Sequence, residues 1–341
     1  MVEEKKEEKK EYRKDFRDLE KEVIERGKCS LCGACVSTCF THGYLTIDLD
    51  KEIPVMKDTV KYEDEDVCPT NCGYCYYQCP RVEEPELKDT FEEIYAVVTK
   101  DEEIRKVCQD GGVVTSIFAY VLDEGIVEGC ITSSYKGEWI PEVVVAEDKP
   151  TLIKSAGTRY TPAVLLTGLA DAVMRYDFES IALVGTPCQI TAYRRMVVEG
   201  AGAYKQASKV KFTMGLFCTE TFIYEKLMKE YLERELGINI SEITKFSIEK
   251  GKFYVHAGEK ELLGVKIDEL HEYVREGCKI CEDFSAKFAD ISVGSVGAPP
   301  GVSAVIIRTE VGREIFEGAI EKGYIESRPI EEVKPGLVAI R

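Results

Sequence analysis

The chain has 341 residues, of which 44% are hydrophobic and 31% are charged, so it is long and apolar enough for about two domains with real cores. Its formal net charge of -17 argues against nonspecific binding to nucleic acid. The longest uncharged stretch, 291–307, is interrupted by glycine and proline, so we predict no transmembrane segment and a cytoplasmic protein, at most peripheral on the cytoplasmic face of a membrane.

The first 21 residues form a segment of mixed charge that begins "MVEEKKEEKKEYRKD". The segment lacks the apolar region of a signal peptide, and its lysines are interspersed with glutamates instead of forming a basic arm. We therefore predict a frayed, solvated helix over 1–21, with the first domain beginning at residue 22.

Fourteen cysteines without an export signal indicate metal ligation more than a disulfide framework. Two runs of four contain Cys29, Cys32, Cys35 and Cys39, and then Cys68, Cys72, Cys75 and Cys79, with Pro80 following. Such runs bind 4Fe-4S clusters, and in two-cluster ferredoxins the fourth cysteine of each run crosses to the other cluster. We predict one cluster on Cys29, Cys32, Cys35 and Cys79, and a second on Cys68, Cys72, Cys75 and Cys39. A pair of zinc sites is the alternative, which two near-identical four-cysteine runs disfavour.

The two runs resemble the bacterial two-4Fe-4S ferredoxin module, and the resemblance covers about residues 22–84. Cys39 lacks the usual following proline, and Cys68 stands one residue farther from Cys72 than the common spacing, so Cys68 is the ligand that the pattern specifies least. Between the runs, "GYLTIDLDKEIPVMKD" alternates apolar and polar residues about a charged turn and predicts a hairpin. His42, beside this hairpin, is interpreted as a surface or packing residue.

The polar segment "RVEEPELKDT" predicts a linker, with a second domain over 85–341. A strand at 93–100, a loop at 108–112, a helix at 113–125 and a strand at 126–135 form a predicted β-α-β unit. Glycines open its helix, whose first backbone amides and positive dipole end could hold a phosphate. The candidate phosphate-binding residues are Gly111, Gly112, Val113 and Thr115. A tight turn without a ligand is the alternative, and no G-x-G-x-x-G fingerprint occurs in the chain.

Two further strand-loop-helix segments, "SIALVGTPCQITAYRRMVVEG" and "KVKFTMGLFCTETFIYEKLMKEYL", place Cys188 and Cys218 in equivalent positions. Parallel strands end at one sheet edge, so we expect these cysteines to be neighbours, each with a pKa lowered by the following helix. With Cys278 and Cys281 of "EGCKICEDFS" they make a predicted third 4Fe-4S site.

Cys188 could instead be a nucleophile, because a cysteine between a strand and a helix is a usual catalytic arrangement. The chain has only His42, His256 and His271, and none is obviously placed as a base for it. The cluster is therefore favoured, which leaves Cys108 and Cys130 as ordinary buried cysteines.

The stretches "QDGGVVTSI", "KSAGTRYTPA", "VGTPCQ" and "GCKICEDFSAKFADISVGSVG" are similar to the beta subunits of coenzyme F420-reducing hydrogenase and archaeal formate dehydrogenase over most of 85–341. Fused to a ferredoxin-like module, the chain most resembles the input subunit of reduced-F420 dehydrogenases, which feed a membrane quinone or methanophenazine complex. The resemblance implies one FAD, a 4Fe-4S cluster in the second domain, and F420 as substrate.

The expected fold is α/β, with an N-terminal two-cluster ferredoxin-like domain and a larger flavin-binding domain built on a mixed sheet. In "KSAGTRYTPA" a glycine turn carries donors suited to phosphate and ribose oxygens of FAD, with a polar loop as the alternative. These donors are Ser155, Thr158, Arg159, Tyr160 and Thr161. Asp290, Ser292 and Gly294 are placed beside the flavin, and Lys154, Arg194 and Arg195 are candidates for the anionic tail of F420. The alternative for the arginine pair is that it faces solvent.

The predicted function is oxidation of reduced F420 by hydride transfer to FAD, with single electrons leaving through the clusters to a membrane complex or to ferredoxin. No catalytic acid or base is assigned, because the cofactors carry the reaction. The sequence leaves the physiological direction and the terminal acceptor open. One alternative is the F420-reducing beta subunit of a formate dehydrogenase or hydrogenase, and another is an electron-transfer scaffold without a substrate of its own.

Overall fold

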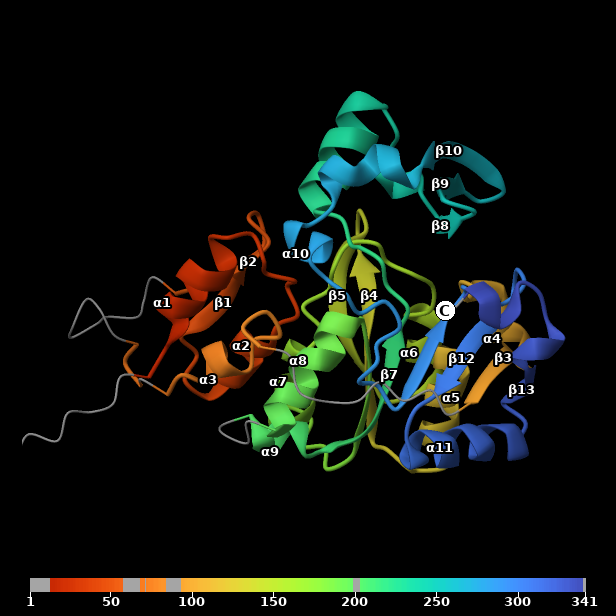
Figure 1. Ribbon diagram of the computed structural model, residues 1–341, viewed down its shortest axis with the longest axis horizontal. Helices are drawn as coiled ribbons and strands as arrows, with labels where there is room; N and C mark the ends of the chain where they lie inside the picture. Colours follow the sequence, from red (N-terminus) through yellow and green to blue (C-terminus); the bar gives the residue numbers. More distant parts are fainter. Residues whose placement is uncertain (1–12, 58–67, 71, 84–92, 199–202, 340–341) are drawn as a thin grey trace, which may run out of the picture.

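The computed structural model describes residues 13–57, 68–70, 72–83, 93–198 and 203–339. Figure 1 shows three parts: an N-terminal unit (13–57 and 68–83), a main domain built on one large sheet, and a small lobe (222–274) that stands over one end of that sheet. The predicted linker falls mostly on 84–92, which lie outside the described residues.

The N-terminal unit consists of short helices and one hairpin. The helices are α1 (Phe16–Leu19), η1 (Glu20–Ile24), α2 (Ala34–Thr38), η2 (Cys39–Thr41) and α3 (Tyr74–Tyr77), and the strands are β1 (Leu45–Asp48) and β2 (Ile53–Met56). The strands pair antiparallel, with Leu45 opposite Met56, so the predicted hairpin is confirmed.

The expectation of a solvated N-terminal segment is wrong for residues 13–21, while 1–12 lie outside the described residues. Phe16, Leu19 and Val23 lie on one helical face and are each about 2% exposed, packed in the core of the N-terminal unit. The buried Asp15 caps this helix and also accepts a hydrogen bond from the backbone amide of Cys68 at 2.8 Å. The unit therefore begins before residue 22.

The main sheet has eight strands, in the order β13-β3-β12-β11-β7-β6-β4-β5. Their bounds in that order are Ile325–Pro329, Glu93–Thr99, Ser303–Ile307, Ile291–Gly294, Val210–Leu216, Ile181–Gly185, Gly129–Lys136 and Ile140–Ala146. Strands β11, β7, β6 and β4 are parallel, whereas β12, β13 and β5 run antiparallel to their neighbours. The prediction of an α/β fold with a mixed sheet is confirmed.

Helices cover both faces of this sheet. Along β6, Ile181 and Leu183 face one core while Ala182 and Val184 face the other, the alternation expected of a strand buried on both sides. Helices α5 (Val113–Asp123) and α11 (Glu310–Glu321) pack on one face, and α7 (Thr167–Met174), α8 (Pro187–Val198) and α9 (Tyr204–Ala207) on the other. Shorter helices are α4 (Glu102–Val107), α6 (Lys149–Lys154), η6 (Ile330–Glu332) and η7 (Gly336–Ala339).

The predicted β-α-β unit exists as β3, α5 and β4, but its two strands are not neighbours. Strands β12, β11, β7 and β6 lie between them in the sheet. Periodicity identified these elements, whereas their spacing in the sheet depends on strands from much later in the sequence.

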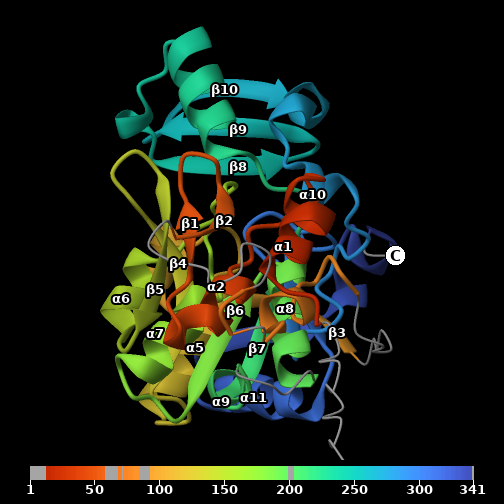
Figure 2. The same ribbon diagram turned by 90° about the vertical axis from the view of Figure 1, so that its left-hand side faces the viewer.

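The lobe is a separate small α/β layer that the sequence did not indicate. It contains helices η3 (Glu225–Glu235), η4 (Ile240–Glu242) and η5 (Ile267–Tyr273) and an antiparallel sheet of β8 (Lys245–Glu249), β9 (Lys252–Ala257) and β10 (Lys260–Lys266) (Figure 2). Helix α10 (Glu276–Lys279) follows the lobe. Trp139 from the β4–β5 turn enters the core of the lobe, and its indole donates to the carbonyl of Ile243 at 3.0 Å.

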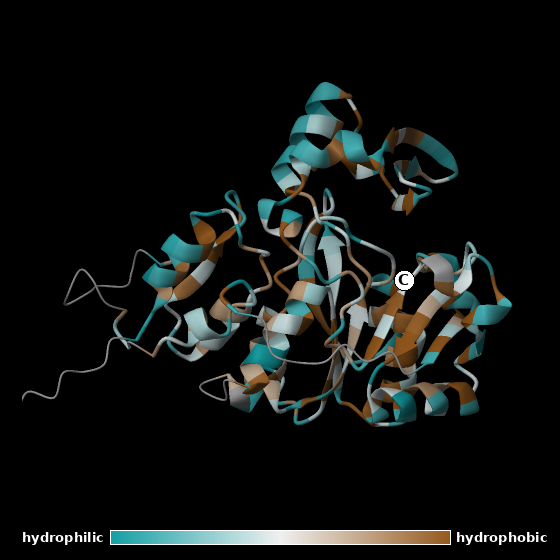
Figure 3. Cartoon of the chain, in the orientation of Figure 1, coloured by the Kyte–Doolittle hydropathy of each residue, from teal (hydrophilic) through white to brown (hydrophobic). Residues whose placement is uncertain are grey.

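Hydrophobic residues concentrate in the strands of the main sheet, and the lobe helices carry hydrophilic residues outward (Figure 3). Among the described residues, no helix combines the length and the apolar character needed to span a membrane.

Candidate functional site

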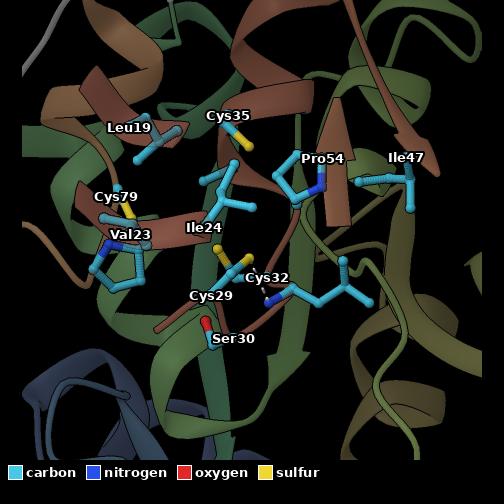
Figure 4. Close-up of a pocket in the computed structure, with 14 residues that line it drawn as sticks. Leu19, Val23, Ile24, Cys29, Ser30, Cys32, Cys35, Ile47, Pro54 and Cys79 are labelled. Atoms are coloured by element: carbon cyan, nitrogen blue, oxygen red, sulfur yellow. Dashed lines mark hydrogen bonds between the residues drawn. The ribbon is translucent and has the colours of Figure 1, made fainter. Parts of the chain in front are cut away.

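Four cysteines line an apolar cavity inside the N-terminal unit. The cavity encloses about 400 Å³ of empty space, including space open to solvent, and Cys29, Cys32, Cys35 and Cys79 contribute their thiols to it. Figure 4 shows their sulfur atoms facing the space between the η1 helix and the hairpin residues Ile47 and Pro54. We call these four the first thiol group. They are the set that the sequence assigned to one cluster, and their role as ligands stays a prediction.

A second cavity, of about 480 Å³ by the same measure, is lined by Cys39, Cys68, Cys72 and Cys75. This second thiol group includes Cys68, whose amide is held by Asp15 at 2.8 Å. In both cavities the fourth cysteine of one run therefore lies with three cysteines of the other. The crossed arrangement arises because α2 and α3 pack against each other.

Burial controls the protonation of the first thiol group. It raises the pKa of Cys79 to about 11, and it raises the pKa of Cys32 and Cys35 well above the ordinary value, with repulsion from neighbouring thiols adding to the effect. Thiolates at these positions need a positive centre among them, and metal binding would release their protons. Among the described residues, no three Cys, His, Asp or Glu side chains gather closely enough to hold a single metal ion.

The third thiol group lies where the main domain meets the N-terminal unit. Cys188 is in the first turn of α8, Cys218 follows β7, Cys278 is in α10 and Cys281 comes just after it. Strands β6 and β7 are parallel neighbours, as predicted, so the segments after them emerge at the same sheet edge. The charges of Cys188, Cys278 and Cys281 all act on Cys218, so the four lie together.

Hydroxyl groups accompany two of these thiols. The Oγ1 atom of Thr186 is 3.3 Å from the sulfur of Cys188, and that of Thr221 is 3.4 Å from the sulfur of Cys278. The expected lowering of the thiol pKa by helix ends is wrong. Burial raises the pKa of Cys188 and Cys218, and the helix after Cys218 begins only at Glu225.

The three thiol groups follow one another through the molecule. Cys32 of the first group is close enough to Cys188 of the third for their charges to interact, and Cys35 is likewise close to Cys75 of the second. The first group therefore stands between the other two. A path from the third group to the second therefore passes the first.

Close backbone contacts hold the N-terminal unit against the main domain. The amide of Leu166 donates to the carbonyl of Cys32 at 3.1 Å. A Cβ atom on Gly33 would lie 2.8 Å from the carbonyl oxygen of Val164, and one on Gly277 would lie 2.5 Å from that of Lys28. Only glycine permits these approaches, so the sequence sets the distance between the first and third groups.

The glycine turn before α5 is tightly packed. Gly111 donates its amide to the Oγ atom of Ser303 at 3.0 Å, and a Cβ on it would lie 2.4 Å from the carbonyl of Val97. Gly112 has φ +74° and caps the helix. The Gly111 amide is thus used within the protein, against the expectation of a free donor. The amides of Gly112, Val113 and Thr115 stay the predicted phosphate donors.

The loop 154–161 contains a half-buried arginine, Arg159, that has an unused hydrogen-bond donor. Arg159 donates from Nη1 to the carbonyls of Ser155 and Gly157, both at 2.6 Å, and its guanidinium lies 5.4 Å from the ring centre of Tyr135. Burial lowers the pKa of Arg159 to about 10. Its Nε is buried without a hydrogen-bond partner in the described part of the chain. Such a donor suits an anionic or carbonyl ligand.

The other residues of this loop differ in exposure. Thr161 is buried, and Thr158 is half-buried. The Ser155 hydroxyl donates to the carbonyl of Thr151 at 3.0 Å, and the Tyr160 carbonyl accepts from the amide of Phe222 at 2.8 Å, which joins the loop to the lobe. Lys154 is exposed at the end of α6.

Asp290, predicted to lie beside a flavin, is instead engaged inside the protein. Its carboxylate accepts from the amide and hydroxyl of Thr213, both at 2.8 Å, from Thr309 at 2.8 Å and from Arg194 at 3.1 Å. These contacts tie β7, α8 and the start of α11 together. The side chain is fully committed to this network.

Ser292 and Gly294 also have structural roles. The buried Ser292 hydroxyl donates to the carbonyl of Ala286 at 3.2 Å and accepts from Nε of Arg308 at 2.7 Å. A Cβ on Gly294 would lie 2.2 Å from the ring of Phe217. The placement of this segment against a flavin ring is therefore not supported by its contacts.

Arg194 and Arg195 neither face solvent nor offer free cations to a substrate. Arg194 donates to the carbonyl of Phe288 and pairs with Asp290, and Arg195, 3% exposed, donates to the backbone carbonyls of Tyr77 and Glu83. These contacts engage both guanidinium groups within the protein, and binding of the F420 tail by either residue stays a prediction. Arg195 instead fastens the N-terminal unit to α8.

Sequence reasoning overlooked three charged residues at the junction. Glu52 and Arg275 form a buried ion pair at 2.8 Å, and Arg81 donates to the carbonyl of Gly277 at 2.8 Å. The signal for Arg81 was present, because it follows the Cys79-Pro80 pair directly. Glu52 lies in a hairpin turn, where a charged residue is expected to be exposed to solvent. The sequence therefore contains no sign that Glu52 forms a buried ion pair.

Two family models match the chain. One is described as coenzyme F420 hydrogenase/dehydrogenase, beta subunit N-term, and matches residues 94–170. The other describes the C terminus of the same beta subunit and matches residues 178–333. Both matches lie after the N-terminal unit, and the second includes the third thiol group.

Individual proteins give the same result. The chain is 42% identical to the beta subunit of coenzyme F420 hydrogenase of Methanothermobacter thermautotrophicus over 73% of its length and 88% of the relative. It is 33% identical to a subunit of the F(420)H(2) dehydrogenase of Methanosarcina mazei over 93% of its length and 88% of the relative. A chain of the F420-reducing [NiFe] hydrogenase complex from Methanosarcina barkeri matches with a TM-score of 0.71 and 35% identity, covering 76% of this chain and 89% of that one.

Proposed function

The chain belongs to the family of coenzyme F420 hydrogenase/dehydrogenase beta subunits and is an F420-dependent oxidoreductase subunit, and we propose that it oxidises reduced F420 on a bound FAD and exports the electrons singly through three 4Fe-4S clusters. The observation that carries this proposal is the row of three thiol groups, which begins in the family domains and continues through the N-terminal unit.

The proposed reaction conserves atoms and charge. Reduced F420 gives oxidised F420, two protons and two electrons, of which a hydride carries both electrons and one proton. A bound FAD would supply the conversion from hydride transfer to single-electron transfer, and the α5 turn and Arg159 would hold it. The protein needs no strong acid or base for this reaction. Its residues hold the cofactors, keep water from the cysteine cavities and determine the order of the electron carriers.

The FAD site is proposed at the junction of the α5 turn and the loop 154–161. The unpartnered Nε of Arg159 and the first amides of α5 supply the donors that a pyrophosphate requires. The residues present therefore fit the group. Lys154, exposed on the same loop, is the remaining candidate cation for the F420 tail, since Arg194 and Arg195 are engaged elsewhere.

The three clusters are proposed on the three thiol groups. Burial and mutual repulsion make uncompensated thiolates costly at Cys32, Cys35 and Cys218, which suits the cationic core of a cluster. Each group supplies the four ligands that a 4Fe-4S cluster takes. The ferredoxin-like character of the N-terminal unit is part of the same proposal. It rests on the two crossed cavities.

The proposed acceptor is a membrane quinone or methanophenazine oxidoreductase complex, or a ferredoxin, that takes electrons from the second thiol group. The F(420)H(2) dehydrogenase subunit matches 93% of this chain, whereas the hydrogenase subunit matches 73%, so the fused arrangement favours the dehydrogenase comparison. Peripheral attachment to the cytoplasmic face of a membrane is proposed on this basis.

Anaerobic mixing tests the substrate. The purified protein, with its FAD and iron measured, is mixed separately with reduced F420 and with NADH, and flavin absorbance is followed. We expect bleaching by reduced F420 alone. Bleaching by NADH would contradict the substrate assignment, and a protein that purifies without flavin would favour a scaffold that has no substrate of its own.

A further inference from the structure

We infer that Arg81 is a positioning residue whose fixed charge holds up the reduction potentials of the clusters on the first and third thiol groups, and so allows electrons to pass between them. The inference rests on the proposed function, because it needs clusters at both groups. It assigns to the junction a control point that neither family match includes.

Arg81 stands between the two groups. Its Nη2 donates to the carbonyl of Gly277 at 2.8 Å, which anchors the guanidinium beside α10. On the main-domain side its charge acts on Cys188, Cys281 and Cys278. On the other side the same charge acts on Cys29 and Cys79. One cation therefore faces thiols of both groups.

The guanidinium retains unused hydrogen-bonding capacity. Arg81 is partly buried, and its Nε is a buried donor without a partner in the described part of the chain. A guanidinium has five N–H donors in a rigid fork, so the ones left over can reach sulfur acceptors on a cluster. Donors and positive charge near cluster sulfurs favour the reduced, more negative form.

The charge on Arg81 is secure. A guanidinium group is not deprotonated in proteins, so Arg81 keeps its positive charge whether or not the neighbouring thiols hold a cluster. Since the site is shielded from water, the charge acts more strongly on its neighbours than it would at the surface. The same charge therefore serves as a constant part of the electrostatic environment of both groups.

The two other arginines at this junction have different partners. Arg195 donates to the carbonyls of Tyr77 and Glu83, and Arg275 pairs with Glu52. Both arginines hydrogen-bond to oxygen atoms and hold the two parts of the protein together, although the charge of Arg275 also acts on the Cys29 thiol of the first group. The charge of Arg81 acts on thiols of both the first and the third groups, which is why we assign the tuning role to it.

Redox titration of the whole protein tests this role. Wild type, Arg81→Gln, Arg81→Met and Arg81→Lys are purified without oxygen, their iron and FAD are counted, and cluster midpoint potentials are measured by EPR with a chemical reductant and mediators. Lys279→Gln is the matched control, because Lys279 lies next to Cys278 in sequence but pairs with Glu276 near the surface.

We expect both neutral variants to hold full iron and to show more negative potentials for two of the three clusters. Arg81→Lys should keep most of the wild-type potential, and Lys279→Gln should match the wild type. Unchanged potentials in the neutral variants would overturn the inference. Loss of iron in both of them would also overturn it, since Arg81 would then serve assembly.

The titration uses no F420, so its outcome is independent of the substrate assignment. A wild-type protein without clusters would instead show that the proposed function is wrong. The two failures are therefore distinguishable.

Discussion

The Nη1 atom of Arg275 lies 2.8 Å from Oε2 of Glu52, and this buried ion pair joins the β1–β2 turn to the segment that carries Cys278. Glu52 also accepts from the amide of Tyr224 at 2.6 Å, and Arg275 donates from Nη2 to the carbonyl of Glu52 at 3.0 Å. One carboxylate therefore connects the N-terminal unit, the lobe and the third thiol group. The position of the third group relative to the first depends on it.

Removing one partner of this pair should destabilise the protein strongly. Arg275→Met leaves the Glu52 carboxylate buried without its cation, and such a change typically costs about 3 kcal/mol or more. Denaturant unfolding of the anaerobic protein measures the loss. The double variant Glu52→Gln, Arg275→Met should recover part of it, and a double variant no more stable than Arg275→Met would contradict the coupling.

The same variant should show a defined pH dependence. Burial raises the pKa of Glu52 above its ordinary value of 4.5, while Arg275 opposes this, so Arg275→Met should raise it further. A raised carboxyl pKa means that the folded protein binds a proton that the unfolded chain releases, so stability is lost as pH rises through the folded pKa. The loss of unfolding free energy relative to wild type should be large near about pH 8 and should shrink toward about pH 5. A deficit independent of pH would show that Glu52 is not its cause.

Gly33 should tolerate no side chain. It has φ +89°, and a Cβ on it would lie 2.8 Å from the carbonyl of Val164 in the main domain. We expect Gly33→Ala to cost about 3 kcal/mol through strain and a displaced interface. Gly43→Ala is the matched control, because Gly43 has φ +67° but its nearest neighbour would be the Lys57 amine at 3.8 Å, so it should cost only about 1 kcal/mol. Equal losses of unfolding free energy would exclude the interface contribution.

Arg159 should be required for FAD retention. Arg159→Gln removes the charged donor, and a hydrogen bond to a charged group contributes about 1.5–3 kcal/mol, so FAD affinity should fall about ten- to a hundredfold. FAD titration of the apoprotein measures this. Lys154→Gln is the comparison: it should raise the KM for F420 with kcat and FAD affinity nearly unchanged, the pattern of lost uniform binding. Normal FAD affinity in Arg159→Gln would remove the loop from the site.

Asp290→Asn should weaken the fold without touching the flavin. The substitution removes the charge that Arg194, Thr213 and Thr309 share, at a cost of about 2 kcal/mol. FAD content and flavin reduction potential should equal those of the wild type. A shifted flavin potential at full stability would instead place Asp290 beside the ring, as the sequence suggested.

The spacing of the cysteines predicts which thiols lie together, because spacing is a local property of the chain. A C-x2-C-x2-C segment must wrap one small space, and Cys188 and Cys218 follow strands that the pattern already paired. The alternation of apolar and polar residues likewise predicts the hairpin at 45–56 and the strand β3. In each case neighbours in sequence determine the geometry.

The features that the sequence did not reveal depend on distant partners. The direction in which Arg194 points depends on Asp290, and that of Arg195 depends on the N-terminal unit, which lies against α8. Helical periodicity gives no information about either partner. The lobe has a core of its own, but its strands β8 and β10 begin and end with charged residues, a pattern that predicts exposed segments and not a buried core. Asp290 and Ser292 are predicted to lie beside the flavin because they follow the loop that carries Cys278 and Cys281. In the structure, Arg194 donates to Asp290 and Arg308 donates to Ser292.

The order of electron carriers is the central claim, and rapid anaerobic mixing with one equivalent of reduced F420 tests it most directly in wild type and Cys281→Ser. Flavin and iron-sulfur absorbance are followed together, with iron and FAD counted beforehand. The wild type should hold about twelve irons per chain and show flavin reduction followed by cluster reduction. In Cys281→Ser the flavin should still be reduced while the N-terminal clusters stay oxidised. Reduction of those clusters at the full wild-type rate, with FAD bound normally, would contradict the account.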